Sequence, residues 1–322
     1  MRRRRRGGGP ERARKVRGGA RFAAFAALLL ACSTPPKRGF DADTGGSSSS
    51  SGGLGSSGGF DSDGGAPPGD GCTDAARLVY VVSAENDLYS FTPNTATFQR
   101  IGPLECPTNG LATPNSMAID REGTAWVNFS DGSLFKVSTA NASCSSTSFQ
   151  PNQSGFLRFG MAFATNGEDS TDETLYVSGL GGGGGGGLGL GKIDLDTMTL
   201  TVLGDYTGNL AGQGAELTGT GDGHLYGFFT TQPFATLAEI DRSNGATSND
   251  QALDGVQTGS AWAFSFWGGD FWFYTSEGTS PSRVTRLATS GSGDISVVKG
   301  DVGGFRIVGA GVSTCAPTAP PK

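Results

Sequence analysis

The feature that most constrains this chain is a repeat of about 47 residues that runs from Cys72 to about Pro317. One aromatic residue marks each unit, at spacings of 46, 50, 50 and 46 residues, and two apolar columns follow it. The three columns are Tyr80, Trp126, Tyr176, Tyr226 and Trp272; Leu88, Leu134, Leu190, Leu237 and Val284; and Phe91, Val137, Ile193, Ile240 and Leu287. Such units must stack, because a single repeat cannot bury its own apolar face.

Each unit contains four short β-prone runs separated by turn residues, and no long helical period is present. Four-stranded units at this period are typical of a β-propeller. The sequence therefore predicts an all-β, five-bladed β-propeller over residues 72–317, with a tail at 318–322. Six or seven blades with degenerate units would need more than the roughly 245 residues present.

The first unit lacks an inner strand of its own, because only Cys72–Arg77 precedes Leu78. The run Arg306–Cys315 has the character of an inner strand and no partner strands after it. We expect this C-terminal strand to complete blade 1 and close the ring. Closure of this kind removes an open sheet edge that would otherwise invite aggregation.

The first 31 residues have the character of an export signal. Ten of the 24 basic residues lie there, and an apolar run of ten residues follows, Phe22–Ala31, which is too short to remain as a membrane anchor. The next four letters, Leu29-Leu30-Ala31-Cys32, resemble the bacterial lipobox. That resemblance implies cleavage before Cys32, a lipid on its thiol and, with Ser33 next, sorting to the outer membrane. An ordinary secretory signal is the alternative.

Residues 32–71 read as the lipidated cysteine and a tether. Positions 33–71 hold 12 Gly and 9 Ser, too little apolar surface to offset ordering entropy. Outside residues 1–31 the chain has 14 basic and 29 acidic residues, a net charge of -15, so we expect no nucleic-acid partner. The predicted partners are the membrane, through the lipid, and a glycan or envelope protein. We expect a monomer.

Four cysteines remain once Cys32 is set aside, and they allow three pairings. An exported chain favours disulfides. In the propeller arrangement, Cys315 would end the closing strand and Cys72 would enter its neighbour. Cys106 would follow the outer strand of blade 1, and Cys144 would precede that of blade 2. The arrangement therefore predicts Cys72–Cys315 and Cys106–Cys144.

Two motifs that suggest chemistry have simpler explanations. The glycine run Gly181–Gly187 precedes Lys192 as in a phosphate loop, but Ile193 stands where a Ser or Thr would bind magnesium. We expect a surface hairpin loop there. His224 is the only histidine, so it builds no multi-histidine metal site, and no Gly-x-Ser-x-Gly motif accompanies it. We predict neither a metal site nor a cofactor.

Three carboxylates are the weak catalytic candidates: Asp120, Glu216 and Asp222, on or just beyond inner strands. Propeller glycosidases need an acid and a base beside the central pocket. Asp120 and Asp222 also suit turns before Gly123 and Gly223. Glu216 is the acid that turn chemistry explains least, which makes it the residue to mutate.

Unit 5 is rich in aromatic residues, most of which we expect to pack between blades. Trp267 lies at a turn before Gly268 and Gly269. An exposed tryptophan near a propeller mouth stacks on a sugar ring or a peptide. Trp267 is therefore our candidate for ligand binding.

The segments Ser116–Val127 and Leu134–Val137 resemble propeller repeats of the NHL and gluconolactonase-like kind. Lipobox, tether and repeats together resemble predicted propeller lipoproteins of myxobacteria, a resemblance that implies no particular activity. Gluconolactonase-like enzymes bind a metal through Glu, Asn and Asp of inner strands, and only Glu216 matches that set. We therefore expect a lipid-anchored binding or scaffold module for a glycan or protein. The alternative is a hydrolase or lactonase that acts in the central pocket.

Overall fold

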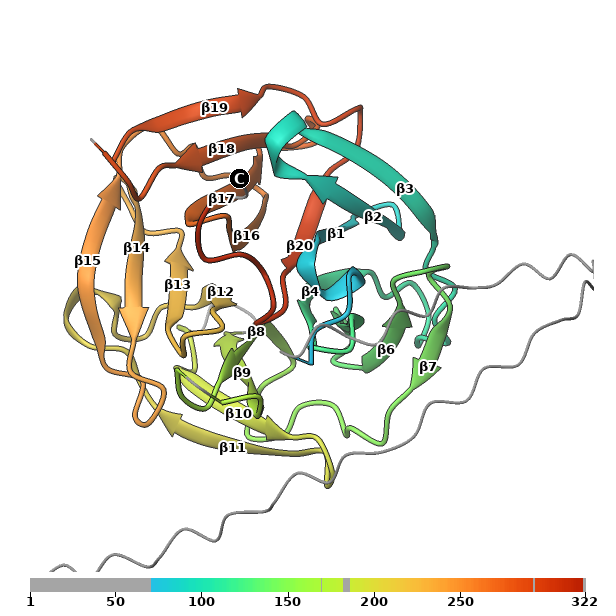
Figure 1. Ribbon diagram of the computed structural model, residues 1–322. Helices are drawn as coiled ribbons and strands as arrows, with labels where there is room; N and C mark the ends of the chain where they lie inside the picture. The colour runs from blue at the N-terminus through green and yellow to red at the C-terminus, as the bar shows by residue number, and fades with distance from the viewer. Residues whose placement is uncertain (1–70, 169, 182–185, 292, 321–322) are drawn as a thin grey trace, which may run out of the picture. The chain divides into compact units, whose positions relative to one another are not determined.

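Five four-stranded antiparallel sheets stand in a ring in the computed structural model (Figure 1). The structure describes residues 71–168, 170–181, 186–291 and 293–320. The predicted signal peptide, Cys32 and nearly all of the tether lie outside these residues. No helix in the described part is long and apolar enough to cross a membrane. The prediction of an all-β, five-bladed propeller is confirmed.

Every blade has its innermost strand first and its outermost strand last. Blade 1 consists of β20 (Ile307–Gly311), β1 (Val79–Ser83), β2 (Asp87–Thr92) and β3 (Thr97–Pro103), and blade 2 of β4 (Pro114–Ile119), β5 (Thr124–Phe129), β6 (Leu134–Ser138) and β7 (Cys144–Ser146). Blade 3 consists of β8 (Arg158–Thr165), β9 (Glu173–Leu180), β10 (Leu190–Asp194) and β11 (Thr199–Gly204). Blade 4 consists of β12 (Ala215–Gly219), β13 (Leu225–Phe229), β14 (Ala235–Ile240) and β15 (Thr247–Leu253), and blade 5 of β16 (Ala261–Trp267), β17 (Asp270–Ser276), β18 (Arg283–Leu287) and β19 (Ile295–Lys299).

The aromatic column falls on the second strand of each blade, where its rings face long charged side chains of the third strand. Trp126 lies opposite Lys136, whose ammonium group is 4.5 Å from the centre of the indole ring. Trp272 lies opposite Arg286, with the guanidinium 5.9 Å from the ring centre. The alkyl stems of such side chains cover the aromatic faces while their charges stay hydrated.

The apolar columns pack in the seams between neighbouring blades. Phe91 of blade 1 meets Trp272 and Tyr274 of blade 5 edge to face, at centroid distances of 5.8 and 5.7 Å. Trp126 of blade 2 meets Phe163 of blade 3 in the same way, at 6.3 Å. Each blade therefore buries its faces against its neighbours, as the repeat requires.

The C-terminus closes the ring as predicted. Strand β20 pairs antiparallel with β1, and Val81 lies opposite Ala310. The disulfide Cys72–Cys315 spans 243 residues and fastens this closure, with Cα atoms 5.8 Å apart. The second disulfide, Cys106–Cys144, ties blade 1 to blade 2, with Cα atoms 5.1 Å apart. Both predicted pairings are confirmed, and both distances are ordinary for disulfides.

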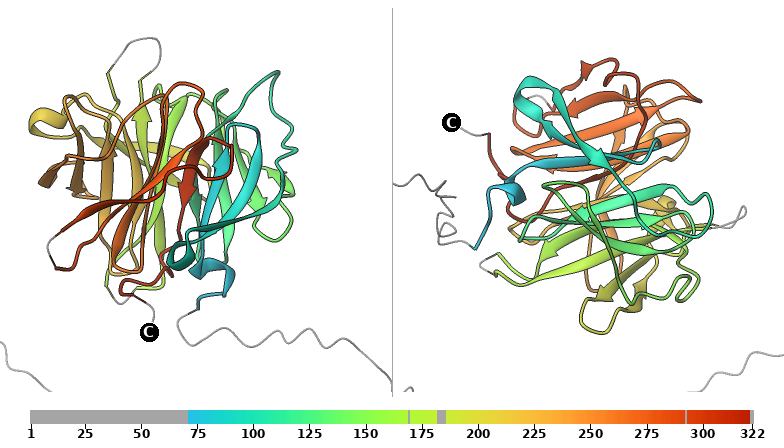
Figure 2. Two further views of the ribbon diagram at one scale, coloured as in Figure 1. Left: turned by 90° about the horizontal axis from the view of Figure 1, so that it is seen from above. Right: turned by 90° about the vertical axis from the view of Figure 1, so that its right-hand side faces the viewer.

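The innermost strands lie very close together around the axis of the ring (Figure 2). A Cβ atom added to Gly160 of β8 would lie 2.1 Å from the carbonyl oxygen of Ala215 on β12. A Cβ atom added to Gly309 of β20 would lie 3.0 Å from the Cα atom of Ser116 on β4. These positions require glycine because the neighbouring backbone occupies the space of a side chain.

Candidate functional site

The ring has two faces, and the segment Val312–Pro317 covers one of them. This segment continues from β20 and crosses the centre of the ring (Figure 1). Residues 312–316 are buried. Because the ends of all five innermost strands meet here, we call this side the sealed face.

Each blade contacts the covering segment. The Ser313 hydroxyl donates to the carbonyl of Ala76, just before blade 1, at 2.7 Å. The Gly268 N–H of blade 5 donates to the carbonyl of Pro317 at 2.7 Å. The carbonyl of Thr314 packs so closely against Gly221 of blade 4 that a Cβ atom there would be 2.3 Å away. Blades 2 and 3 contact Thr314 through the side chains described next.

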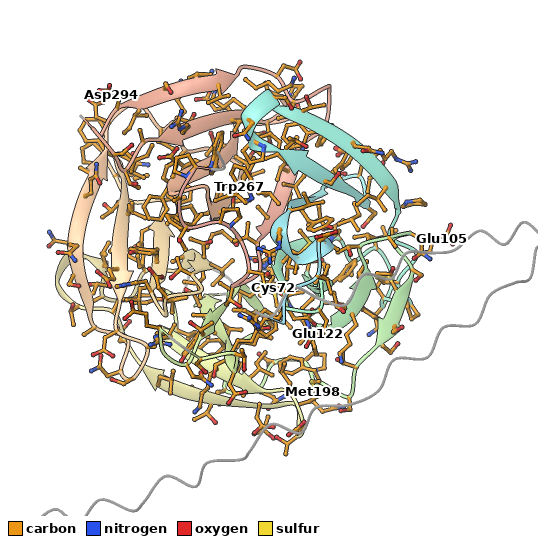
Figure 3. All side chains as sticks on the ribbon, in the orientation of Figure 1. Cys72, Glu105, Glu122, Met198, Trp267 and Asp294 are labelled. Atoms are coloured by element: carbon orange, nitrogen blue, oxygen red, sulfur yellow. A yellow bond between two sulfur atoms is a disulfide. The ribbon has the colours of Figure 1, made fainter. Side chains whose placement is uncertain are left out.

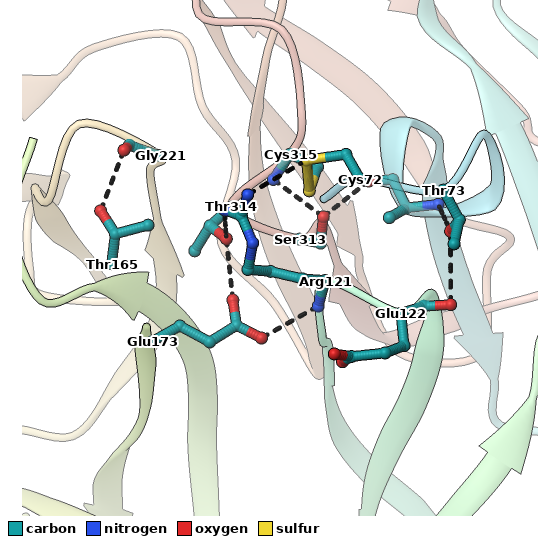
Figure 4. The surroundings of a disulfide bond; sticks show 11 residues. Cys72, Thr73, Arg121, Glu122, Thr165, Glu173, Gly221, Ser313, Thr314 and Cys315 are labelled. Carbon is teal, nitrogen blue, oxygen red and sulfur yellow. Dashed lines mark hydrogen bonds between the residues drawn. A yellow bond between two sulfur atoms is a disulfide. The ribbon is translucent and has the colours of Figure 1, made fainter. Parts of the chain in front are cut away.

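A buried polar network completes the sealed face beside the Cys72–Cys315 disulfide (Figure 4). The Glu173 carboxylate of β9 accepts the Arg121 N–H at 2.9 Å and the Thr314 hydroxyl at 2.8 Å. The Arg121 guanidinium donates to the Thr314 hydroxyl oxygen at 3.1 Å. Burial raises the pKa of Glu173 to about 7 despite these hydrogen bonds. The sequence analysis did not single out this network, because no local motif marks Arg121 or Glu173.

The opposite face contains a cavity of about 570 Å³, which we call the cup. It is lined by the first residues of all five innermost strands, namely Val308 of β20, Pro114 and Asn115 of β4, Arg158 of β8, Glu216 of β12, and Ala261 and Trp262 of β16. Loop residues around its rim include Thr113, Ser130, Gln213, Thr230 and Ser260. Contributions from all five blades are typical of a propeller's ligand site, because such sites gather at the mouth of the ring.

Glu216 sits in the wall of the cup with its carboxyl group buried. Its Oε2 accepts a hydrogen bond from the hydroxyl of Ser116 at 2.7 Å, although Ser116 belongs to blade 2 and Glu216 to blade 4. The Cα–H₂ of Gly160 on the intervening β8 leaves room for this contact, since a Cβ there would be 2.8 Å from the Glu216 Cα. Burial raises the pKa of Glu216 well above its ordinary value, which favours the protonated form.

The other two carboxylate candidates lie at the sealed face and have structural partners. Asp120 accepts the Thr124 N–H at 2.7 Å and the Trp126 indole N–H at 2.9 Å. Burial raises the pKa of Asp120. Asp222 accepts a hydrogen bond from the Thr220 hydroxyl in the turn after β12. The structure therefore does not bring Asp120 or Asp222 to Glu216.

Within the described residues, Glu216 is the only carboxylate that lines the cup. The same residues contain no group of three or more His, Cys, Asp or Glu side chains arranged to hold a metal ion. The paired carboxylates of a glycosidase are thus not formed by the described part of the cup.

His224 and the glycine run have unremarkable positions. The His224 Nδ1 lies 2.6 Å from a carboxylate oxygen of Glu239, which also accepts from Asn249 at 2.9 Å. The hydrogen bond with His224 lowers the pKa of Glu239. Of the glycine run, Gly181, Gly186 and Gly187 line the rim of the cup, and residues 182–185 lie outside the described residues.

The expectation that Trp267 is exposed is wrong. Only 8% of the residue is accessible, and its indole N–H donates to the carbonyl of Arg77 at 2.9 Å. Trp267 ends β16 and therefore lies at the sealed face (Figure 3), where the bond from Gly268 to Pro317 keeps the C-terminal segment over it. The sequence could not reveal this cover, because it depends on where the chain goes after β20.

The tryptophan of the cup is Trp262, at the other end of the same strand. It is half-buried against the core of blades 4 and 5, and its indole N–H makes no hydrogen bond with a described residue. Arg158, which is exposed, and the Gln213 side chain likewise have no hydrogen-bond partner in the described part of the chain. The signal that would have found Trp262 is its place at the start, not the end, of an inner strand.

No family model and no curated protein matches this sequence. Among solved structures, the chain is similar to TolB from Acinetobacter baumannii at 13% identity and a TM-score of 0.40, over 69% of this chain and 52% of that one. A gluconolactonase from Xanthomonas campestris is 12% identical with a TM-score of 0.43, over 71% of this chain and 74% of that one. The PQQ-bound aldose sugar dehydrogenase of Streptomyces coelicolor is 11% identical with a TM-score of 0.40, over 74% and 82%.

The chain thus spans about half the length of the TolB that it matches. At these identities the likeness concerns the fold alone. The class defined by the fold and the site is a five-bladed β-propeller with one sealed face and one open cup. What the cup does must be argued from its own residues.

Proposed function

We propose that this protein is an exported binding module whose cup takes a glycan. The observation that carries the proposal is the set of polar and aromatic groups that the cup leaves without partners: the Trp262 indole, the Arg158 guanidinium and the Gln213 amide, all among the described lining residues. A sugar ring offers an apolar C–H face for an aromatic ring and hydroxyl groups for planar side chains. A cavity of about 570 Å³ is large enough for small sugars.

Binding fits the cup better than hydrolysis does. A hydrolase of the two-carboxylate kind needs one group that donates a proton and a second that acts as base or nucleophile. Among the described lining residues Glu216 stands alone, and its oxygen is already bonded to Ser116. The hydrolase or lactonase alternative is tested with Glu216→Gln, which should leave a binder's affinity within about twofold and abolish an enzyme's turnover.

The binding proposal is tested with the full-length protein and a panel of cell-wall and capsular oligosaccharides. A ligand present at 100 times its dissociation constant raises the free energy of unfolding by about 2.7 kcal/mol, which a thermal-shift assay detects. Trp262→Ala should remove the shift. The control Val297→Ala changes an apolar residue that is 52% exposed on the outer strand β19 and should retain it. A shift that survives Trp262→Ala would place the ligand elsewhere.

We also propose that Cys32 carries a lipid that holds the protein at the outer membrane. The two disulfides support an exported location, since disulfides persist in oxidising compartments. Cys72 lies at the sealed face, so a lipid joined to the chain before it would leave the cup directed away from the membrane. Cys32→Ala should move the protein from the detergent phase to the aqueous phase. Unchanged partitioning would contradict the anchor without touching the cup.

A further inference from the structure

A second hollow adjoins the cup on the open face. Its volume is about 640 Å³, and it shares two lining residues with the cup, Gln213 and Thr230. Its floor and walls come from blade 4 and the loop before it: Asn209, Leu210, Thr231, Gln232, Pro233, Phe234, Thr236, Asp250 and Ala252. Because two residues belong to both, the cup and this hollow form one continuous groove.

An aromatic side chain stands at each end of the groove. Trp262 lines the cup, and Phe234, which is 46% exposed, lines the hollow. Between them the shared residues, Gln213 and Thr230, offer an amide and a hydroxyl. An exposed phenylalanine in a water-filled hollow has no role in the core, so its exposure asks for an explanation.

The Phe234 loop is held in place by its own hydrogen bonds. The Thr231 hydroxyl donates to the carbonyl of Phe234 at 2.8 Å and lies 2.8 Å from the hydroxyl oxygen of Thr236. A ligand that stacks on Phe234 therefore meets a surface that is already ordered, which reduces the entropic cost of binding.

We propose that the open face binds a linear oligosaccharide, with one end in the cup against Trp262 and the chain running past Gln213 and Thr230 to Phe234. This inference rests on the proposed glycan-binding function and adds the length of the ligand to it. A sugar chain fits because it repeats apolar C–H faces and hydroxyl groups along its length, as the groove alternates aromatic and polar side chains. A peptide is the competing ligand, and the experiment includes it.

The experiment is calorimetric titration of the full-length protein with linear gluco-oligosaccharides, chito-oligosaccharides and oligouronates of one to six units. In the series that binds, affinity should rise about tenfold or more with length and then level off. Phe234→Ala should remove that gain, so that long and short members bind alike, and leave the shortest bound member unchanged. Trp262→Ala should weaken all lengths, and Val297→Ala none.

The outcomes separate the two claims. If Phe234→Ala leaves the long chains unaffected, or weakens short and long chains equally, the length proposal is overturned while glycan binding at Trp262 stands. If no oligosaccharide of any length binds in a Trp262-dependent way, both the length proposal and the proposed function fail. Binding of extended peptides, lost in Phe234→Ala and without any oligosaccharide binding, would also overturn both. The thermal unfolding of Phe234→Ala should match that of the parent protein, because the ring is exposed.

Discussion

The two faces of this propeller are built from the two ends of the same five innermost strands, yet their polar groups are treated in opposite ways. At the sealed face, Glu173, Arg121 and Thr314 bond with one another under the C-terminal segment. At the open face, the side chains of Trp262 and Arg158 have no hydrogen-bond partner in the described part of the chain. Ring closure and ligand binding thus occupy separate ends of the fold.

This separation explains how one face can be left unsatisfied. The sealed face joins the last strand to the first, so its contacts, including a disulfide across 243 residues, resist opening of the whole ring. The open face then only has to present side chains on strands that are already fixed. Changes at the sealed face should therefore alter stability, and changes at the open face should alter binding.

The largest effect is expected from the disulfide that fastens the closure. Replacing Cys72 and Cys315 together by Ser should lower the free energy of unfolding by about 5 kcal/mol, because the bond closes a long loop. The matched control, Cys106→Ser with Cys144→Ser, opens a 38-residue loop and should cost about 4 kcal/mol. Urea unfolding measures both. A closure variant as stable as the parent would contradict a sealed face that holds the ring together.

A smaller loss is expected where the innermost strands touch. Gly160→Ala should lower the free energy of unfolding by about 3 kcal/mol, because its Cβ would meet the backbone carbonyl of Ala215. Gly300→Ala is the control, since nothing lies within 4 Å of a Cβ there, and it should change stability by about 0.5 kcal/mol or less. Equal effects in denaturant titrations would show that the strands are less closely packed than described.

The sealed face should also make stability depend on pH. The folded-state pKa of Glu173 is about 7, above the ordinary value of 4.5, so the folded protein holds a proton that the unfolded chain has released. Stability should therefore fall as pH rises from about 4.5 to about 7 and level off above it. Glu173→Gln should flatten the melting temperature across that window. A variant with the parent's slope would assign the pH dependence to another group, such as Glu216.

The smallest effect on stability is expected at Glu216 in the cup. Because burial favours its protonated form, Glu216→Gln replaces one neutral, hydrogen-bonding group by another of the same shape. The free energy of unfolding at pH 7 should change by about 1 kcal/mol or less. A gain or loss of several kcal/mol would mean that the carboxyl group is ionised in the folded protein.

Features that depend on the repeat alone were predictable from the sequence, and features that depend on the two faces were not. The columns through Trp126 and Leu134, the closing strand and the disulfide partner of Cys72 all follow from one period repeated five times. Which end of an inner strand stays open depends instead on the path of the chain after Gly311. This is why Trp267 and Trp262, five residues apart on β16, exchanged their expected and observed exposure.

The candidate site was predictable only at Glu216, and for an incomplete reason. Glu216 stood out because turn chemistry did not explain it, and the structure explains it by a hydrogen bond to Ser116, 100 positions away in the sequence. Arg158 and Phe234 carry no local signal, since an arginine that begins a strand and a phenylalanine in a loop are common. Their meaning comes from the groove that distant blades create together.

The central claim is that ligands bind at the open face while the sealed face only holds the ring closed. Hydrogen–deuterium exchange of the full-length protein, with and without the tightest-binding oligosaccharide, tests it most directly. We predict slower exchange at residues 113–116, 158–160, 212–216 and 260–263, and no change at residues 120–124 and 312–317. Protection confined to the sealed-face residues would contradict the account.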